Sequence, residues 1–189
     1  MTLEAALQAF FAQHPTETFH ALAIDAGYIY LDSEEALEQR RRRYSAEWED
    51  ETRTVTADEA RAVDGTDESR ALNYFRFYRE KGEPFEAALE FENSARARRR
   101  AEGNPYERPG SNELERLRYE SGDFEYQQLV NLGLDREYQR HYEKNQPWYS
   151  AYARKVRKLV KRLEKDRDAV FRGVKLSSDF RIYAVDHEL

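Results

Sequence analysis

The sequence predicts a helix-rich α+β fold, organised as a single domain over residues 1–189. Three observations support it. A short amphipathic helix near the N-terminus is followed by two alternating, strand-like segments. Apolar residues then recur at helical spacing through a long middle region. Strand-like residues return near the C-terminus, so we expect a small antiparallel or mixed sheet built from an N-terminal and a C-terminal hairpin, with helices packed on it.

The N-terminal hairpin is the clearest element. Residues 3–13 form the expected helix, with Thr2 as its cap and a stop at His14-Pro15. Residues 18–24 and 28–31 read as two strands joined by a turn at Ala26-Gly27. Both faces of the first strand are apolar, which is typical of a strand covered on two sides.

Helices dominate the region that follows. Ser33 caps a long helix in which Tyr44 and Trp48 share one ridge. Thr56 and Glu59 make a capping box for a short helix. Further helices are expected at 68–81, from Pro84, at 113–120 with an Asn112–Glu115 capping box, at 124–132 and at 135–144.

The sequence also predicts where this helical region is interrupted. Residues 94–111 are rich in Arg, Pro and Gly and suggest an exposed loop. The stretch at about 82–145 is therefore expected to be a helical middle or insertion. The longest helix opens at Pro147, and a segment 170–176, a turn at 177–179 and a strand at 180–185 complete the predicted C-terminal hairpin.

Composition excludes several classes of protein. The chain has no Cys, which removes disulfides, Cys-ligated metal sites and thiol catalysis. No run of 18 apolar residues exists, and the N-terminus lacks the basic region of a signal peptide. We expect a cytoplasmic protein with no membrane partner.

No catalytic, nucleotide-binding or metal motif is present, so we expect a non-enzymatic protein with no cofactor and no metal site. A hydrolase-type enzyme with a cleft at the sheet edge remains an alternative. It requires at least two of a small set of side chains to converge. The set is His20, Asp25, His141, Asp186 and His187.

Charge is unevenly distributed along the chain. Residues 1–70 carry a net charge of −9, whereas residues 136–175 carry +8. An acidic surface favours a basic partner, chiefly by raising the association rate. The candidate partner-binding residues are Glu47, Glu49, Asp50, Glu51, Asp58 and Glu59.

The basic segment supports a different hypothesis. Residues 154–165 form an amphipathic helix whose polar face suits phosphate binding by a nucleic-acid-associated protein. A solvated face opposite a core stripe produces the same pattern, and the acidic net charge of −6 weakens the nucleic-acid hypothesis. The candidate phosphate-binding residues are Arg154, Lys155, Lys158, Lys161 and Arg162.

Three segments together carry a family resemblance: HPTETFHALAIDAGYIYLDSEEAL, RYSAEWEDE and FRGVKLSSDFRIYAVDHEL. In this order they resemble an uncharacterised bacterial domain family found beside polymorphic-toxin and immunity genes. The resemblance covers about 50 of the 189 residues. It implies a small cytoplasmic α+β protein that binds a protein partner, in the manner of an immunity protein that occludes a cognate toxin, and it supplies no functional residues.

Overall fold

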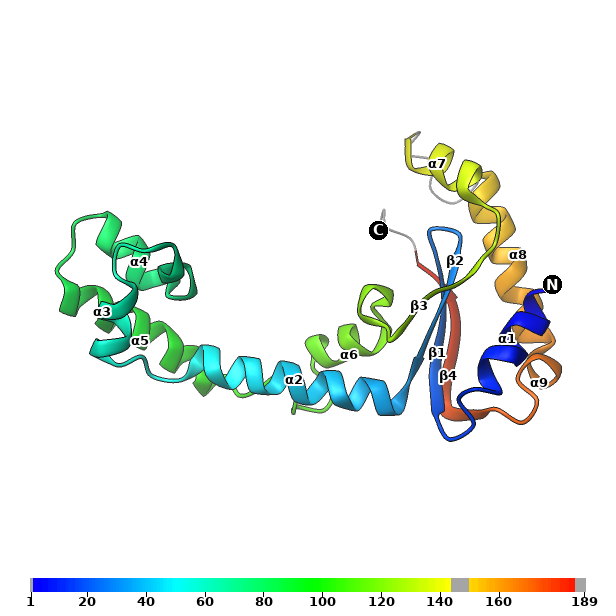
Figure 1. Ribbon diagram of the computed structural model, residues 1–189, viewed down its shortest axis with the longest axis horizontal. Coiled ribbons are helices and arrows are strands. Elements are labelled where there is room, and N and C mark those ends of the chain that lie inside the picture. The colour runs from blue at the N-terminus through cyan, green and yellow to red at the C-terminus, as the bar shows by residue number, and fades with distance from the viewer. Residues whose placement is uncertain (1, 144–149, 186–189) are drawn as a thin grey trace. The chain divides into compact units, whose positions relative to one another are not determined.

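Four strands form one mixed sheet in the computed structural model, which describes residues 2–143 and 150–185 (Figure 1). The strand order is β3-β2-β1-β4. β1 runs antiparallel to β2 and parallel to β4, while β3 is antiparallel to β2. The strands are β1 (Thr18–Asp25), β2 (Tyr28–Ser33), β3 (Tyr126–Asn131) and β4 (Lys175–Ala184). The predicted helix-rich α+β fold with a mixed sheet is confirmed.

Helices make up most of the remaining described chain, together with short 3₁₀ segments at Asp67–Ala71 and Ser121–Asp123. The helices are α1 (Leu3–Phe11), α2 (Glu34–Thr52), α3 (Ala57–Val63), α4 (Asn73–Glu80), α5 (Phe85–Ala101), α6 (Asn112–Tyr119), α7 (Asp135–Glu143), α8 (Ala151–Lys165) and α9 (Arg167–Val170). Among the described residues, no helix has both the length and the apolar character needed to cross a membrane.

The chain divides into two compact units. Unit 1 comprises residues 1–40 and 116–189 and contains the sheet. Unit 2 comprises residues 41–115 and is helical throughout its regular structure. In sequence, unit 2 is therefore an insertion between the first two strands and the last two.

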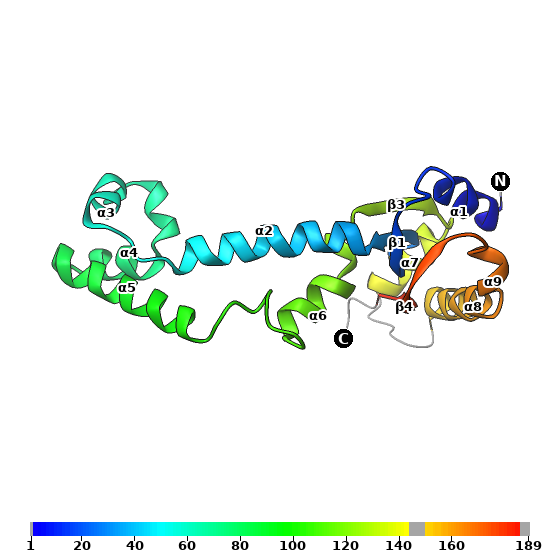
Figure 2. The same cartoon turned by 90° about the horizontal axis from the view of Figure 1, so that it is seen from below.

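The core of unit 1 lies between the sheet and helices α1, α8 and α9, which cover one face in both views (Figures 1 and 2). Phe19, Leu22 and Ile24 from β1 are completely buried in it. Phe11 and Phe19 pack edge to face, with ring centroids 5.0 Å apart. The apolar stripe predicted on α8 is confirmed, because Val156 and Leu163 belong to the same cluster.

The opposite face of the sheet carries smaller and more polar side chains. Ala21 and Ala23 are fully buried beneath Tyr30 and Phe124. A bulge in β1 between Phe19 and Ala21 brings His20 into contact with the Phe124 ring on this second face. The expectation that β1 is covered on both sides is confirmed.

The β1–β2 turn has the backbone that two-residue hairpins favour. Ala26 and Gly27 both have positive φ, 48° and 86°, as a type I′ turn requires. The Gly27 amide donates to the Tyr152 hydroxyl at 3.2 Å, and its carbonyl accepts from the Leu132 amide at 2.9 Å. A side chain at Gly27 would come within 3.4 Å of Leu134.

Three local predictions are wrong. The helix expected at 124–132 is strand β3, because pairing with β2 outweighs local helical spacing. The expected C-terminal hairpin is one strand, β4, in which the segment between Leu176 and Arg181 bulges out of the ladder with β1 instead of reversing the chain. The loop expected at 94–111 begins only after Ala101, because α5 continues through its run of arginines.

The helix caps agree with the sequence predictions at two helices and differ at one. The Thr56–Glu59 capping box is present, and the Ser33 hydroxyl accepts from the Ala36 amide at the start of α2. At α6, however, the capping side chain is Ser111, which accepts from the Leu114 amide at 3.1 Å. Pro147, the expected start of the longest helix, lies outside the described residues, and α8 begins after Ser150. The expectation that this helix is the longest is wrong, because α8 has 15 residues and α2 has 19.

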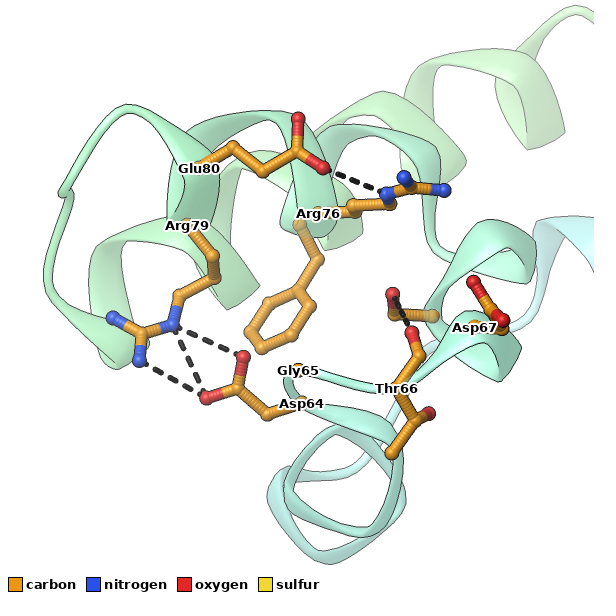
Figure 3. A pocket seen from close by; sticks show the side chains of 9 residues that line it. Asp64, Gly65, Thr66, Asp67, Arg76, Arg79 and Glu80 are labelled. Atoms are coloured by element: carbon orange, nitrogen blue, oxygen red, sulfur yellow. Dashed lines mark hydrogen bonds and ion pairs between the residues drawn. The ribbon is translucent and has the colours of Figure 1, made fainter.

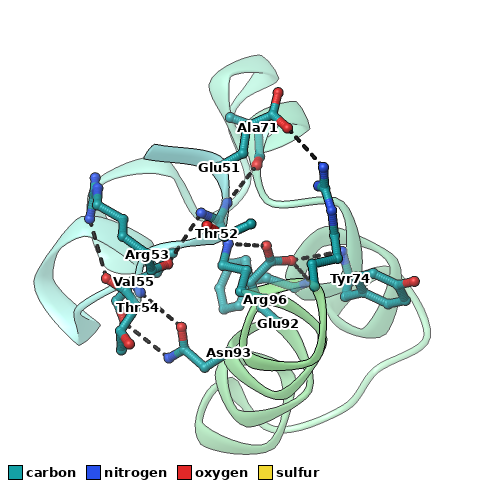
Figure 4. A network of polar contacts seen from close by, with 12 residues as sticks. Glu51, Thr52, Arg53, Thr54, Val55, Ala71, Tyr74, Glu92, Asn93 and Arg96 are labelled. Atoms are coloured by element: carbon teal, nitrogen blue, oxygen red, sulfur yellow. Dashed lines mark hydrogen bonds and ion pairs between the residues drawn. The ribbon is translucent and has the colours of Figure 1, made fainter. Parts of the chain in front are cut away.

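Unit 2 combines a small apolar cluster with a buried polar network (Figure 4). Phe75 and Ala88 pack at the contact of α4 and α5. Beside them, the Glu92 carboxylate accepts from the amides of Tyr74 and Phe75 at 2.9 and 3.1 Å, and so caps α4, whose own N-cap residue has no capping side chain. Arg96 holds Glu92 at 2.6 Å and donates to the carbonyl oxygens of three other residues, Asp50, Arg53 and Ala71.

Candidate functional site

The candidate site lies in unit 2, between α2 and the loop that joins α5 to α6. Polar contacts hold this loop on the helix. The Ser45 hydroxyl donates to the Glu107 carboxylate at 2.9 Å and accepts from the side-chain amide of Asn104 at 2.7 Å. Arg41 donates to the Tyr106 carbonyl at 3.4 Å. Because Ser45 is buried, these contacts fix the loop instead of leaving it to solvent.

A pocket with a cavity volume of about 390 Å³ opens between these segments. This volume is near the lower end of the range for ligand pockets, about 300–1,000 Å³. Three of its side chains are aromatic, Tyr44 and Trp48 from α2 and Tyr106 from the loop. The Tyr44 and Tyr106 rings are stacked, with centroids 5.4 Å apart and planes inclined by 22°. We call this the aromatic–acidic pocket.

The same pocket carries an excess of negative charge. Four glutamates line it against two arginines, and these are Glu47, Glu51, Glu102, Glu113, Arg99 and Arg108. Glu47 and Glu51 lie one turn apart on α2. Residues with that spacing share a helix face, so the two carboxylates and Trp48 come from one stretch of helix.

The acids of the pocket affect the pKa of Tyr106. Burial is the largest cause that raises the pKa of its hydroxyl. The next causes are Tyr44 and the carboxylates of Glu113, Glu51 and Glu47. Negative groups from α2 and α6 therefore act on the same ring.

The acidic residues predicted to bind a partner have different surroundings. Of the six, Glu47 and Glu51 line the aromatic–acidic pocket. Glu49 and Asp50 are exposed on α2, and Asp58 and Glu59 belong to the first turn of α3. Arg53 bridges Asp50 and Glu59 at 2.8 and 2.9 Å, and this contact with the cap hydrogen bonds lowers the pKa of Glu59 to about 2.

Intramolecular arginines thus engage much of the predicted acidic surface. Asp58 pairs with Arg61 at 3.1 Å, and Glu51 pairs with Arg99 at 3.2 Å. Glu47 is 3.8 Å from Arg43. These pairs are exposed, so each contributes little to stability and can exchange for an incoming cation.

The predicted phosphate-binding residues of α8 are all exposed: Arg154, Lys155, Lys158, Lys161 and Arg162. Lys155 and Arg162 already contact carboxylates. Lys155 pairs with Glu137, and Arg162 pairs with Glu4 at 2.9 Å. The face is basic, but part of its charge is neutralised within unit 1.

A second pocket in unit 2 has a volume of about 460 Å³ and lies between α4 and the turn before the 3₁₀ segment 67–71 (Figure 3). Its charged groups pair across or along its rim. Arg79 holds both carboxylate oxygens of Asp64 at 3.0–3.3 Å, and Arg76 pairs with Glu80 at 2.8 Å. Its one aromatic lining residue is Phe75, which is fully buried, so this pocket is a weaker candidate for recognition than the aromatic–acidic pocket.

Unit 1 contains a buried polar cluster that sequence reasoning missed. Asp32 is fully buried and accepts two hydrogen bonds from Arg40, a forked pair between β2 and α2. His20 is also fully buried, and its Nε2 donates to the Arg118 carbonyl at 2.9 Å. The same nitrogen lies 3.3 Å from the Asp32 carboxylate. Burial lowers the pKa of His20, and its Nδ1 has no hydrogen-bond partner within the described chain.

The residues of the hydrolase alternative contact different partners. His20 pairs with Asp32, Asp25 accepts from the Ser121 hydroxyl at 2.6 Å, and His141 is 2.8 Å from the Ser150 hydroxyl. Each of these three side chains is buried. Asp186 and His187 lie outside the described residues.

No family model, curated protein or solved structure matches this chain. The resemblance to an immunity-associated family therefore stays a hypothesis. Sequence reasoning had identified the Tyr44–Trp48 ridge and the neighbouring acids. It missed Tyr106, because its place against α2 depends on the Ser45 and Asn104 contacts across the chain.

Proposed function

We propose that this protein is a non-enzymatic protein-binding module of toxin-immunity type, which occludes a basic partner through unit 2. The aromatic–acidic pocket is the observation that carries the proposal. It combines ring surface, which is enriched at protein interfaces, with carboxylates that select a positively charged partner.

The surroundings of the pocket support a binding role. α2 presents Glu47, Trp48 and Glu51, and the anchored loop supplies Tyr106. Rigid aromatic side chains can bind with a small loss of conformational entropy. The resemblance to an immunity-associated family adds that such a partner is a cognate toxin.

A nucleic-acid-associated role for α8 is the alternative. Its exposed basic residues favour it, whereas the ion pairs of Lys155 and Arg162 with acids of the same unit count against it. Binding to DNA or RNA that weakens steeply as salt rises would distinguish this role from binding to protein.

Isothermal titration against the protein encoded by the neighbouring gene tests the proposal. We expect saturable binding by the wild-type chain and binding at least about tenfold weaker for the E47Q/E51Q variant, which loses two charge-assisted contacts. Both side chains are exposed, so the glutamines should leave the fold intact.

The matched control is E86Q/E90Q, which removes the same charge from two exposed positions on α5. It should bind as the wild type does. No binding by the wild-type chain, or equal weakening in both double variants, would contradict the proposal.

A further inference from the structure

Arginines of this chain already contact two of the side chains that line the aromatic–acidic pocket. The Arg43 guanidinium stands over the Tyr44 ring, 4.9 Å from its centroid. Arg99 reaches the Glu51 carboxylate at 3.2 Å. One contact is made with a ring face and the other with a carboxylate, which are the two interactions a guanidinium makes best.

The pocket brings both kinds of surface together around one volume. Tyr44, Trp48 and Tyr106 supply the rings, while Glu47, Glu51 and Glu113 supply carboxylates from two helices. A cavity of about 390 Å³ accommodates a side chain and excludes a whole secondary-structure element. This volume and the excess of carboxylates suit a single extended side chain with a planar cationic end.

We propose that the aromatic–acidic pocket binds one arginine side chain projecting from the partner protein. This inference deepens the proposed function and rests on it for the identity of the partner as a protein. The guanidinium lies against the aromatic rings and donates hydrogen bonds to the carboxylates of α2.

Arginine fits this pocket better than lysine for a geometric reason. Its guanidinium is planar, stacks on rings and can donate two parallel hydrogen bonds to a carboxylate. A lysine ammonium is a compact and strongly hydrated charge, which loses more hydration on entering an aromatic site.

A small-molecule titration tests this without any partner. The probes are the Nα-acetyl methylamides of arginine, citrulline and lysine, where citrulline keeps the shape of arginine but lacks its charge. The chain has two tryptophans, so a W148F background makes Trp48 the only fluorescent tryptophan. We expect the arginine probe to change Trp48 emission saturably, with lysine at least about fivefold weaker and citrulline without effect.

The variants identify the pocket. E47Q/E51Q in the same background should bind the arginine probe at least about tenfold more weakly, whereas E86Q/E90Q should leave binding unchanged. Circular dichroism spectra and melting temperatures establish that both variants remain folded. An NMR titration of amide shifts in residues 44–51 and 102–108 provides a second readout.

Each other outcome overturns the inference. Equal binding of lysine shows that the pocket senses charge without selecting a guanidinium, and binding of citrulline shows that charge is not needed. Absence of arginine binding removes the inference even if the partner titration succeeds, in which case the proposed function stands alone. Arginine binding without any protein partner would instead leave a pocket for a small guanidinium compound and remove the proposed function.

Discussion

The two units are stabilised in different ways. Unit 1 places a sheet against one large apolar cluster, in which side chains from α1, β1, β2, α8 and β4 are buried together. Unit 2 has a smaller apolar cluster and relies on the Glu92–Arg96 pair to connect α2, the 3₁₀ segment and α4 through backbone groups. Apolar burial depends on contact area, whereas a buried polar network depends on every partner being present.

This difference explains where the candidate site is found. Unit 2 buries few of its large apolar side chains, and several of its aromatic rings remain accessible, including Tyr74, Phe77 and Phe91. Rings and charges that are not used in a core are available for recognition.

The Phe19→Ala substitution should have the largest effect. Phe19 is completely buried and packs against the Phe11 ring, and loss of a buried phenylalanine costs about 3–5 kcal/mol of unfolding free energy. Urea unfolding measures it, and hydrogen exchange should accelerate most in β1 and β4. Phe77→Ala, at a ring that is 52% exposed, is the matched control and should cost far less. Similar losses in the two variants would contradict the role of the unit 1 core.

The Glu92→Gln substitution tests the polar network of unit 2. It keeps the side-chain shape but removes the charge that binds Arg96 and caps α4. We expect a loss of about 1–3 kcal/mol in unfolding free energy, with faster exchange of the Tyr74 and Phe75 amides. Glu90→Gln, on an exposed position of the same helix, should change stability by less than about 0.5 kcal/mol. If the two variants lose the same unfolding free energy, the network does not stabilise unit 2.

The pH dependence of stability provides a finer test on unit 1. Burial lowers the pKa of His20 below its ordinary 6.5. The Asp32 charge, the hydrogen bond to the Arg118 carbonyl and the Glu34 charge oppose this, whereas the positive charge of Arg118 reinforces it. The unfolded chain therefore takes up a proton before the folded chain does. Stability should fall as the pH drops below about 6.5, by at most about 1.4 kcal/mol per pH unit.

The His20→Gln variant isolates this contribution, because glutamine can still donate to the Arg118 carbonyl but does not titrate. Its unfolding free energy, measured by urea between pH 7 and pH 5, should vary less than that of the wild type. An identical pH slope in the two proteins would show that His20 is not responsible.

Sequence reasoning succeeded where the decisive interactions are local. The β1–β2 hairpin, the Thr56–Glu59 capping box and the apolar stripe of α8 all depend on neighbours within a few residues, and all are present. Strand β3 was misread because Tyr126, Leu129 and Val130 stand at i, i+3 and i+4, a spacing that is also typical of a helix. Its pairing with β2, and the positive φ of 53° at Gln128, depend on contacts between distant segments.

The candidate site was predicted in part for the same reason. Tyr44, Trp48, Glu47 and Glu51 lie on one helix, so their shared face follows from periodicity. Tyr106 joins them through a loop that the sequence marked only as rich in Pro, Gly and Arg. The buried Asp32–Arg40 pair was missed because it links the end of a strand to the second turn of the next helix.

The insertion of unit 2 between the two halves of the sheet sets an order of events during synthesis. β1 and β2 leave the ribosome first, but β1 must wait for β4, whose residue Ile182 pairs with Leu22, until the whole of unit 2 has been made. During that wait the central strand of the finished sheet has an open edge, which is a hazard for aggregation. A unit 2 that folds early would shorten the effective loop between the two halves, since loop closure costs less for a compact insert than for a long flexible one.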